Sequence, residues 1–152
     1  MEINAFFDAS FYPTRQRGVI AIFIKDIESN TVILNKTDLI KCKSSSQSEF
    51  NALYKLIKYL NSKQEQAQIS KGIIINIFGD NDEVITFANT SKKFKSLNEQ
   101  LATALNEAFE TLKSNNNVTL MRISRKNNSA HRLLTKFKFV IKSFNHSRYL
   151  LK

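Results

Sequence analysis

Short apolar runs in the first third of the chain predict three β-strands. The runs occupy residues 3–10, 19–24 and 31–34 and are rich in β-branched and aromatic residues. The polar stretch 10–18 separates the first two and holds the only proline, and the stretch 26–30 separates the second from the third. Because apolar runs joined by such turn-forming stretches are typical of consecutive antiparallel strands, this part of the chain predicts a meander.

Helical spacing begins after a polar connection at residues 41–48. Glu49 opens the predicted helix, whose apolar positions are Phe50, Leu53, Leu56, Ile57 and Leu60. Residues 73–78 then form a near-continuous apolar run of the kind found in strands buried on both faces. A strand followed by a helix and a strand implies a parallel crossover.

The second half of the chain continues with helices and one more strand. We expect a short helix over 81–89, a longer helix over 96–113 with an uninterrupted apolar stripe, and a fifth strand over 118–123. A final helix carries Ala130, Leu133, Leu134 and Phe137. Residues 138–152 alternate apolar and basic positions, which leaves a strand or an extended tail open. The chain is thus predicted to be one α/β domain over 1–152, with 138–152 as a C-terminal extension.

The net charge of +10 is located almost entirely in the last quarter of the chain. From residue 111 onward there are ten Lys or Arg, both histidines and no Asp or Glu, whereas the preceding part is neutral. Such asymmetry favours a polyanionic partner, and nucleic acid rather than a membrane, since the basic residues are interleaved with core-type residues. A solvated, soluble surface is the alternative explanation.

Cysteine usage and hydropathy indicate the compartment. Cys42 is the single cysteine and cannot pair within the chain, and no signal peptide is recognisable. The longest apolar runs are too short to span a bilayer. We therefore expect a cytoplasmic, monomeric protein without a membrane segment.

Three acidic residues stand where a carboxylate is unexpected. Asp8 follows an apolar strand, Asp80 follows the run 73–78, and Glu49 lies at the edge of an apolar helix face. An ionised carboxylate at such a place is unfavourable unless it is solvated, paired or bound to a cation. Asp8 and Asp80 become neighbours if the first and fourth strands pair. For Glu49 alone, a favourable charge near a helix N-terminus is the alternative.

Four motifs around these acids resemble the ribonuclease H family, especially its short forms without a basic protrusion. They are Asp8-Ala9-Ser10 after the first strand, Ser48-Glu49-Phe50-Asn51-Ala52-Leu53 at the helix start, Asp80 with Val84 and Asn89, and the stretch 125–134. The last is similar to the family's R-x-x-N-x-x-A-[DH]-x-L ending, with one fewer residue between Arg125 and Asn127. The resemblance covers residues 3–137, and its motifs occur in the family's order.

The resemblance implies a five-stranded mixed sheet in the order 3-2-1-4-5, flanked by helices. It also implies that Asp8, Glu49 and Asp80 hold two Mg²⁺ ions, with Mn²⁺ as a substitute. The residue types suit this role, because Mg²⁺ prefers carboxylate and water oxygens and leaves positions open for a phosphate. A bound cation would also relieve the repulsion among three neighbouring carboxylates.

His131 stands where many family members carry a fourth acidic residue. We expect it one helical turn from Asn127 and facing the site, where it would transfer protons or contact a metal ion more weakly than a carboxylate. A half-buried helix histidine without a catalytic role is the alternative.

The activity that the resemblance implies is cleavage of the RNA strand of an RNA/DNA hybrid, with RNA recognised through its 2′-hydroxyl groups. The family's glycine-rich turn after the first strand is replaced here by residues 11–17. The residues predicted to contact nucleic acid are Arg15, Arg17, Arg122, Arg125, Lys126, Asn127 and Arg132. The alternatives are a nuclease of the same fold acting on another nucleic acid, and a non-catalytic binding or scaffolding module. The sequence leaves open whether a protein partner is required.

Overall fold

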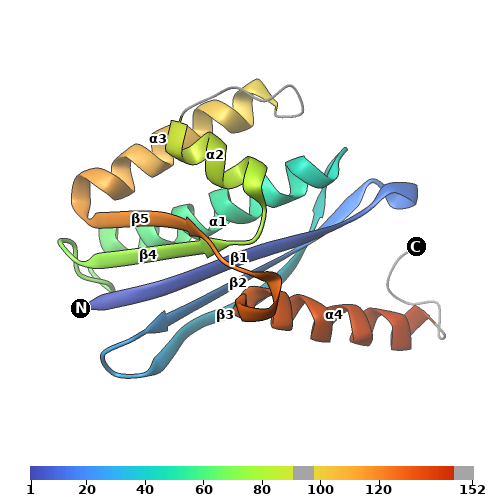
Figure 1. Ribbon diagram of the computed structural model, residues 1–152, viewed down its shortest axis with the longest axis horizontal. Helices are drawn as coiled ribbons and strands as arrows, with labels where there is room; N and C mark the ends of the chain where they lie inside the picture. The colour runs from blue at the N-terminus through green and yellow to red at the C-terminus, as the bar shows by residue number, and fades with distance from the viewer. Residues whose placement is uncertain (91–97, 146–152) are drawn as a thin grey trace.

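A computed structural model describes the backbone of residues 1–90 and 98–145 and the side chains of 1–90 and 98–137. Five strands form one sheet in the order β3-β2-β1-β4-β5, as predicted (Figure 1). The strands are β1 (Glu2–Tyr12), β2 (Arg17–Asp26), β3 (Thr31–Lys41), β4 (Ile74–Gly79) and β5 (Asn117–Arg122). The helices are α1 (Ser45–Glu65), α2 (Asp82–Thr90), α3 (Glu99–Asn115) and α4 (Ser129–Asn145), with 3₁₀ turns η1 (Pro13–Arg15) and η2 (Arg125–Asn127).

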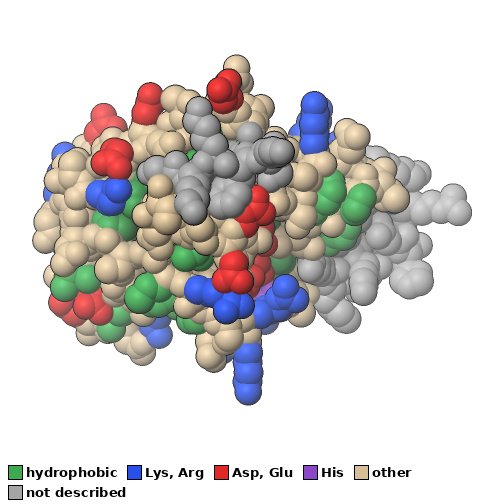
Figure 2. Space-filling model, turned by 45° about the horizontal axis from the view of Figure 1, so that its top comes forward, with side chains coloured by type: hydrophobic (Ala, Val, Ile, Leu, Met, Phe, Trp, Pro, Cys, Tyr) green, Lys and Arg blue, Asp and Glu red, His purple; other side chains and the backbone are tan. Residues whose placement is uncertain are grey.

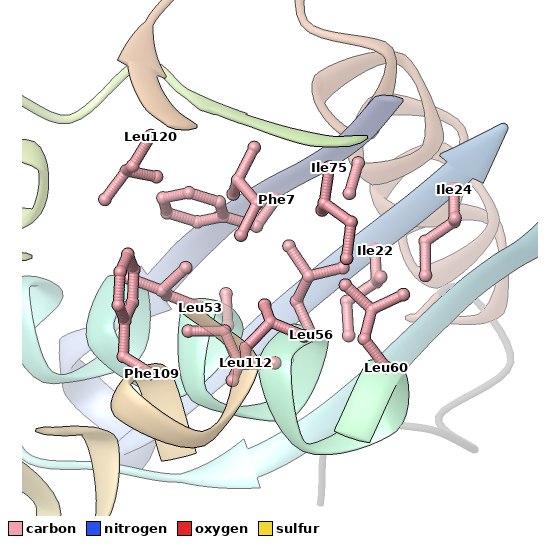
Figure 3. Close-up of a cluster of buried hydrophobic side chains, with 14 of the residues drawn as sticks. Phe7, Ile22, Ile24, Leu53, Leu56, Leu60, Ile75, Phe109, Leu112 and Leu120 are labelled. Atoms are coloured by element: carbon pink, nitrogen blue, oxygen red, sulfur yellow. The ribbon is translucent and has the colours of Figure 1, made fainter. Parts of the chain in front are cut away.

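The helices cover the two faces of the sheet unequally. Helices α1, α2 and α3 lie over one face, and α4 lies over the other (Figure 1). Figure 3 shows the larger core, where strand residues such as Phe7 and Ile75 meet Leu56 of α1 and Leu112 of α3. The smaller core lies under α4 and contains Phe6, Val19, Ala21, Ala130 and Leu134. Since each large apolar side chain stabilises the fold by about 1.5–3 kcal/mol when fully buried, both faces hold β1 firmly in place.

Strand β1 has two neighbours at its start and one at its end. It pairs in parallel with β4 as far as Phe6 and Phe78, and antiparallel with β2 as far as Tyr12 and Arg17. Asp8 lies two residues beyond the last pair with β4, where β1 no longer has a strand on that side. The close approach there depends on Gly79, because a Cβ atom at this position would overlap the Phe7 ring.

Two sequence-based boundaries near this end of the sheet are wrong. The first strand does not end near Ser10 but runs to Tyr12, because its pairing with β2 continues, and the turn is confined to η1 and Gln16. Helix α1 begins at Ser45, not at Glu49, because the Ser44 side chain accepts a hydrogen bond from the Gln47 N–H and caps the helix. Glu49 therefore lies in the second turn of α1, beyond the unpaired N–H groups of its first turn.

The C-terminal part also differs from the prediction. Helix α4 continues through Lys138 to Asn145, where a strand or an extended tail was expected. The remainder of that segment, 146–152, and the start of the predicted helix over 96–113 lie outside the described residues, and α3 is capped by Asn98. None of the helices in the described ranges has the length and apolar character needed to cross a bilayer.

Candidate active site

Asp8 is the centre of a buried polar cluster. Its side chain is almost fully buried, with a residue exposure of 3 %. One carboxylate oxygen, Oδ1, accepts a hydrogen bond from the Ala9 N–H at 2.9 Å. The other, Oδ2, lies 2.8 Å from Nδ1 of His131 on α4. The first strand and the last described helix thus meet at this carboxylate.

Asp80 joins the cluster from the end of β4. Its ligand oxygen, an oxygen of Asp8 and a ring nitrogen of His131 all lie within 4.8 Å of one another. The parallel pairing of β1 with β4 explains this convergence, because it brings Asp8, two residues beyond the paired part of β1, beside the carboxyl end of β4. Carboxylate oxygens with one imidazole nitrogen fit a divalent cation such as Mg²⁺ or Mn²⁺.

Glu49 reaches the same cluster from the second turn of α1. It is 7 % exposed. Burial, together with the negative charges of Asp8 and Asp80, raises the pKa of Glu49 to about 9. Burial and the charge of Asp80 also raise the pKa of Asp8, partly offset by the hydrogen bond from His131. The raised pKa values of Asp8 and Glu49 fit a cation site, since a bound ion would favour the charged forms of both carboxyl groups.

Asn128 is a buried member of the site that the sequence analysis missed. Its side-chain amide donates one hydrogen bond to the Phe7 carbonyl and one to Oδ2 of Asp80, both at 3.0 Å. Its amide oxygen accepts from the Ala130 N–H at 3.0 Å. One fully buried side chain therefore connects β1, the end of β4 and the start of α4.

The sequence held a signal for Asn128. The family pattern R-x-x-N fits Arg125 to Asn128 with its normal spacing, if the missing residue is placed between Asn and Ala. Asn127, from which His131 was predicted to lie one helical turn away, is exposed in η2, before α4 begins, and is not brought to the cluster. Its predicted contact with nucleic acid stays a prediction.

The predicted nucleic-acid-binding residues form two groups, and all of them are exposed except Arg17, which is half-buried. Arg122, at the end of β5, pairs with Asp82 at 2.8 Å between Nε and Oδ1. Arg125, Lys126 and Arg132 follow it in η2 and α4, and all are exposed. Figure 2 shows acidic side chains, a histidine and basic side chains gathered at one place on the surface. The second group, Arg15 and Arg17, lies at the tip of the β1–β2 hairpin.

This sheet order, with carboxylates gathered where β1 and β4 separate, defines a ribonuclease H-like domain. A family model described as reverse transcriptase-like matches residues 6–138. The chain belongs to this family, within the ribonuclease H group. No curated protein sequence matches the chain.

Solved structures share the fold at low sequence identity. RNase H1 from the halophilic archaeon Halobacterium salinarum is 14% identical with a TM-score of 0.66, covering 86% of this chain and 91% of its own. The N-terminal RNase H domain of a Mycobacterium tuberculosis protein is 12% identical with a TM-score of 0.67, covering 93% and 97%. LC11-RNase H1 from a compost metagenome is 14% identical with a TM-score of 0.69, covering 92% and 98%. In complex with an RNA/DNA hybrid, LC11-RNase H1 is 15% identical with a TM-score of 0.67, covering 86% and 92%.

Proposed function

We propose that the protein is a divalent-cation-dependent endonuclease that cuts the RNA strand of RNA/DNA hybrids. The observation that carries this proposal is the convergence of Asp8, Asp80 and His131, with Glu49 beside them, in a chain of this family. The hybrid complex of LC11-RNase H1 supports the choice of substrate.

The carboxylates of Asp8, Glu49 and Asp80 would hold two Mg²⁺ ions, with Mn²⁺ as a substitute. Such ions, when bound, help to deprotonate an attacking water and stabilise the negative charge that develops on the leaving oxygen. The burial of Asp8 and Glu49 excludes bulk water from their side of the cluster. The hydrogen bond from Asn128 holds one oxygen of Asp80 and orients the carboxylate.

We assign to His131 the movement of a proton during hydrolysis. When Nδ1 donates to Asp8, Nε2 is the basic ring nitrogen, and the side chain is 28% exposed, so water and substrate can reach it. In the proposed reaction the water oxygen bonds to phosphorus and the bond from phosphorus to the 3′ oxygen breaks. The 3′ oxygen takes up a proton, which leaves 3′-hydroxyl and 5′-phosphate ends, as the family resemblance implies.

Binding of the hybrid is assigned to these two groups of largely basic residues. Their long side chains suit contacts to phosphate oxygens, which position the duplex without reading its sequence. Contacts to 2′-hydroxyl groups would distinguish RNA from DNA. The residues proposed for binding are Arg15, Arg17, Arg122, Arg125, Lys126, Asn127 and Arg132.

Three further expectations remain proposals. A cytoplasmic location rests on the single cysteine, which is buried. A monomer is the simplest assembly for the chain. The assignment of residues 1–152 to one domain with an extension at 138–152 is likewise proposed.

Cleavage of an end-labelled RNA/DNA hybrid in Mg²⁺ or Mn²⁺ tests the proposed function. Single-stranded RNA, duplex RNA and duplex DNA are the substrate controls, and Asp80→Asn is the protein control. We expect cleavage of the hybrid alone, and none by the variant. Preference for another nucleic acid would identify a different nuclease of the same fold. Binding without cleavage of any substrate would identify a non-catalytic module.

A further inference from the structure

Strand β3 forms one edge of the sheet and has a paired strand on one side only. It is the outermost strand in the order β3-β2-β1-β4-β5, and in the described part of the chain it pairs with β2 alone (Figure 1). That pairing extends along the whole strand, from Thr31 to Lys41. An exposed edge of this length presents a row of N–H and C=O groups to which a further strand can bind.

The opposite edge of the sheet is better protected. Strand β5 has 6 residues, whereas β3 has 11. The Asn89 side chain of α2 also donates a hydrogen bond to the Leu120 carbonyl of β5 at 3.4 Å. Within residues 1–90 and 98–137, no such side-chain hydrogen bond reaches the backbone of β3. Short strands and covered edges prevent unwanted pairing, and β3 has neither protection.

Two opposite charges lie in the middle of the β3 edge. The register partners of Lys36 and Asp38 in β2 belong to the larger core, so both side chains lie on the face that α1 covers. Nζ of Lys36 lies 3.4 Å from Oδ2 of Asp38, and Nζ of Lys55 lies 3.8 Å from the same oxygen. The side chains of Lys36 and Asp38 are 57% and 32% exposed, so a further strand could contact both.

This order of charges favours one antiparallel register between β3 and a second copy of β3. Opposite residues of an antiparallel pair point to the same face, so the register can shift only in steps that keep the faces matched. With Thr37 opposite Thr37, Lys36 of each copy faces Asp38 of the other. The two nearest alternative registers place Lys36 opposite Lys36 or Asp38 opposite Asp38, and like charges directly opposite each other are destabilising.

The other positions of the strand suit the same register. It places Thr37 opposite itself, and threonine pairs stabilise antiparallel strands. It also places Leu34 opposite Ile40, and both are half-buried residues at the margin of the larger core. Their contact would extend the apolar surface of that core across the two copies. A lysine at a strand edge ordinarily opposes pairing, but Asp38 makes Lys36 half of a complementary pair.

We propose that β3 is a dimerisation edge, at which two copies of the chain pair antiparallel about Thr37 and join their five-stranded sheets into one. The inference goes beyond the proposed function and does not depend on it. Because an interface of one strand from each copy is small, the monomer remains the form in dilute solution and the dimer forms as the protein is concentrated.

The acidic cluster lies away from the proposed interface. Asp8 is the register partner of Ala21, and Ala21 is the register partner of Thr37. The two Asp8 residues would therefore lie in one row across the joined sheet, about five strand spacings or about 24 Å apart. Since each copy keeps its own cluster, dimerisation should leave the cleavage rate per chain unchanged.

Sedimentation equilibrium over a wide range of protein concentrations tests the dimer. We expect reversible dimerisation of the wild type. Lys36→Asp and Asp38→Lys should each raise the dissociation constant about tenfold or more, because each places like charges opposite each other twice per dimer. The matched controls are Glu65→Lys and Lys71→Asp, at exposed positions outside β3, which should leave it unchanged. A wild type that is monomeric at every concentration would overturn the proposal.

A mixture of the two β3 variants separates lost pairing from lost folding. When the Lys36→Asp chain meets the Asp38→Lys chain in this register, an acidic residue faces a basic one at both places. Labelled with donor and acceptor dyes, the two variants should form a mixed dimer about as tightly as the wild type forms its own. If the wild type dimerises and the mixture does not, another surface carries the dimer and the proposal is wrong.

Disulfide cross-linking tests the register. In oxidised glutathione, Thr37→Cys should link two copies, since directly opposite residues have Cα atoms about 4.5–5.5 Å apart. The matched control is Asn35→Cys, whose two copies would lie about 13 Å apart and beyond the reach of a disulfide. The wild type, whose Cys42 is buried, should not cross-link. Equal cross-linking of the two variants would contradict the register.

Failure of this proposal differs from failure of the proposed function. If the wild type cleaves hybrids but stays monomeric, the dimerisation edge is wrong and the nuclease stands. If it cleaves nothing but dimerises with the expected dependence on Lys36 and Asp38, the nuclease is wrong and the dimerisation edge stands.

Discussion

The acidic cluster and the hollow between the β1–β2 hairpin tip and the connection from β3 to α1, lined by Arg15, Arg17, Lys41 and Lys43, differ in how the protein treats charge. In the cluster, Asp8 and Glu49 are buried, and hydrogen bonds of 2.8–3.0 Å fix Asp8 and Asp80. In the hollow, only the backbone is fixed, and most of the cationic side chains are exposed. Buried charges interact strongly and are costly to leave uncompensated, whereas exposed charges are screened by water and salt. Changes in the cluster should therefore have much larger effects than changes in the hollow.

The largest effect is expected when one carboxylate of the cluster becomes an amide. Asp8→Asn or Asp80→Asn should slow cleavage of a bound hybrid by about a thousandfold or more, because each change removes several kcal/mol of transition-state stabilisation. Single-turnover kinetics measure this directly. The matched control is Asp82→Asn, an exposed acid two residues from Asp80, which should change the rate only a few-fold. A rate within tenfold of wild type for Asp80→Asn would show that the cluster does not carry the chemistry.

A smaller effect, on stability, is expected from Asn128→Ala. The change leaves the Phe7 carbonyl, an Asp80 oxygen and the Ala130 N–H without their partner, which should lower the free energy of unfolding by about 2–3 kcal/mol. Urea unfolding measures the loss. The neighbouring Asn127→Ala should stay within about 0.5 kcal/mol of wild type, since this side chain is exposed. Equal effects of the two variants would contradict the role given to Asn128.

A graded effect is expected from pH in the absence of metal. Because the pKa of Glu49 is about 9 in the folded protein and near 4.5 in the unfolded chain, the folded state keeps a proton that the unfolded state has lost. The free energy of unfolding should therefore fall as pH rises from about 4.5 to about 9, by at most about 1.4 kcal/mol per pH unit for this one proton. Urea unfolding in EDTA at several pH values measures the slope, which Glu49→Gln should flatten. A slope unchanged by that substitution would assign the pH dependence to other groups.

The parts of the site that depend on residues close together in the sequence were predicted better than the parts that depend on contacts between distant segments. The local pattern of a strand, a helix and a second strand predicted that Asp8 and Asp80 lie close together. The family resemblance predicted the sheet order. The continuation of β1 past Asp8 did not, because its pairing with β2 overrides the turn-like composition after Ser10. The start of α1 was misplaced because several serines could cap it, and the side-chain hydrogen bond of Ser44 decides among them.

Contacts between distant segments explain the other omissions. Asn127 and Asn128 are indistinguishable by residue type, and only the turn η2 decides which of them is buried. The hollow joins Arg17 to Lys41 through strand register, which the composition of neither segment reveals. Sequence patterns thus identified the acidic residues of the site, and the structure identified their hydrogen-bond partners and their neighbours.

Calorimetric titration of Mn²⁺ or Mg²⁺ into metal-free protein tests most directly whether the buried carboxylates form a cation site. Near pH 8, in two buffers of different ionisation enthalpy, we predict that the wild type binds the ion and releases protons, because Glu49 must lose its proton when the cation binds. Asp80→Asn should bind far more weakly, and Glu49→Gln should release fewer protons. Binding that is absent in the wild type, or equal in the wild type and Asp80→Asn, would contradict the assignment of the cluster as a metal-dependent active site.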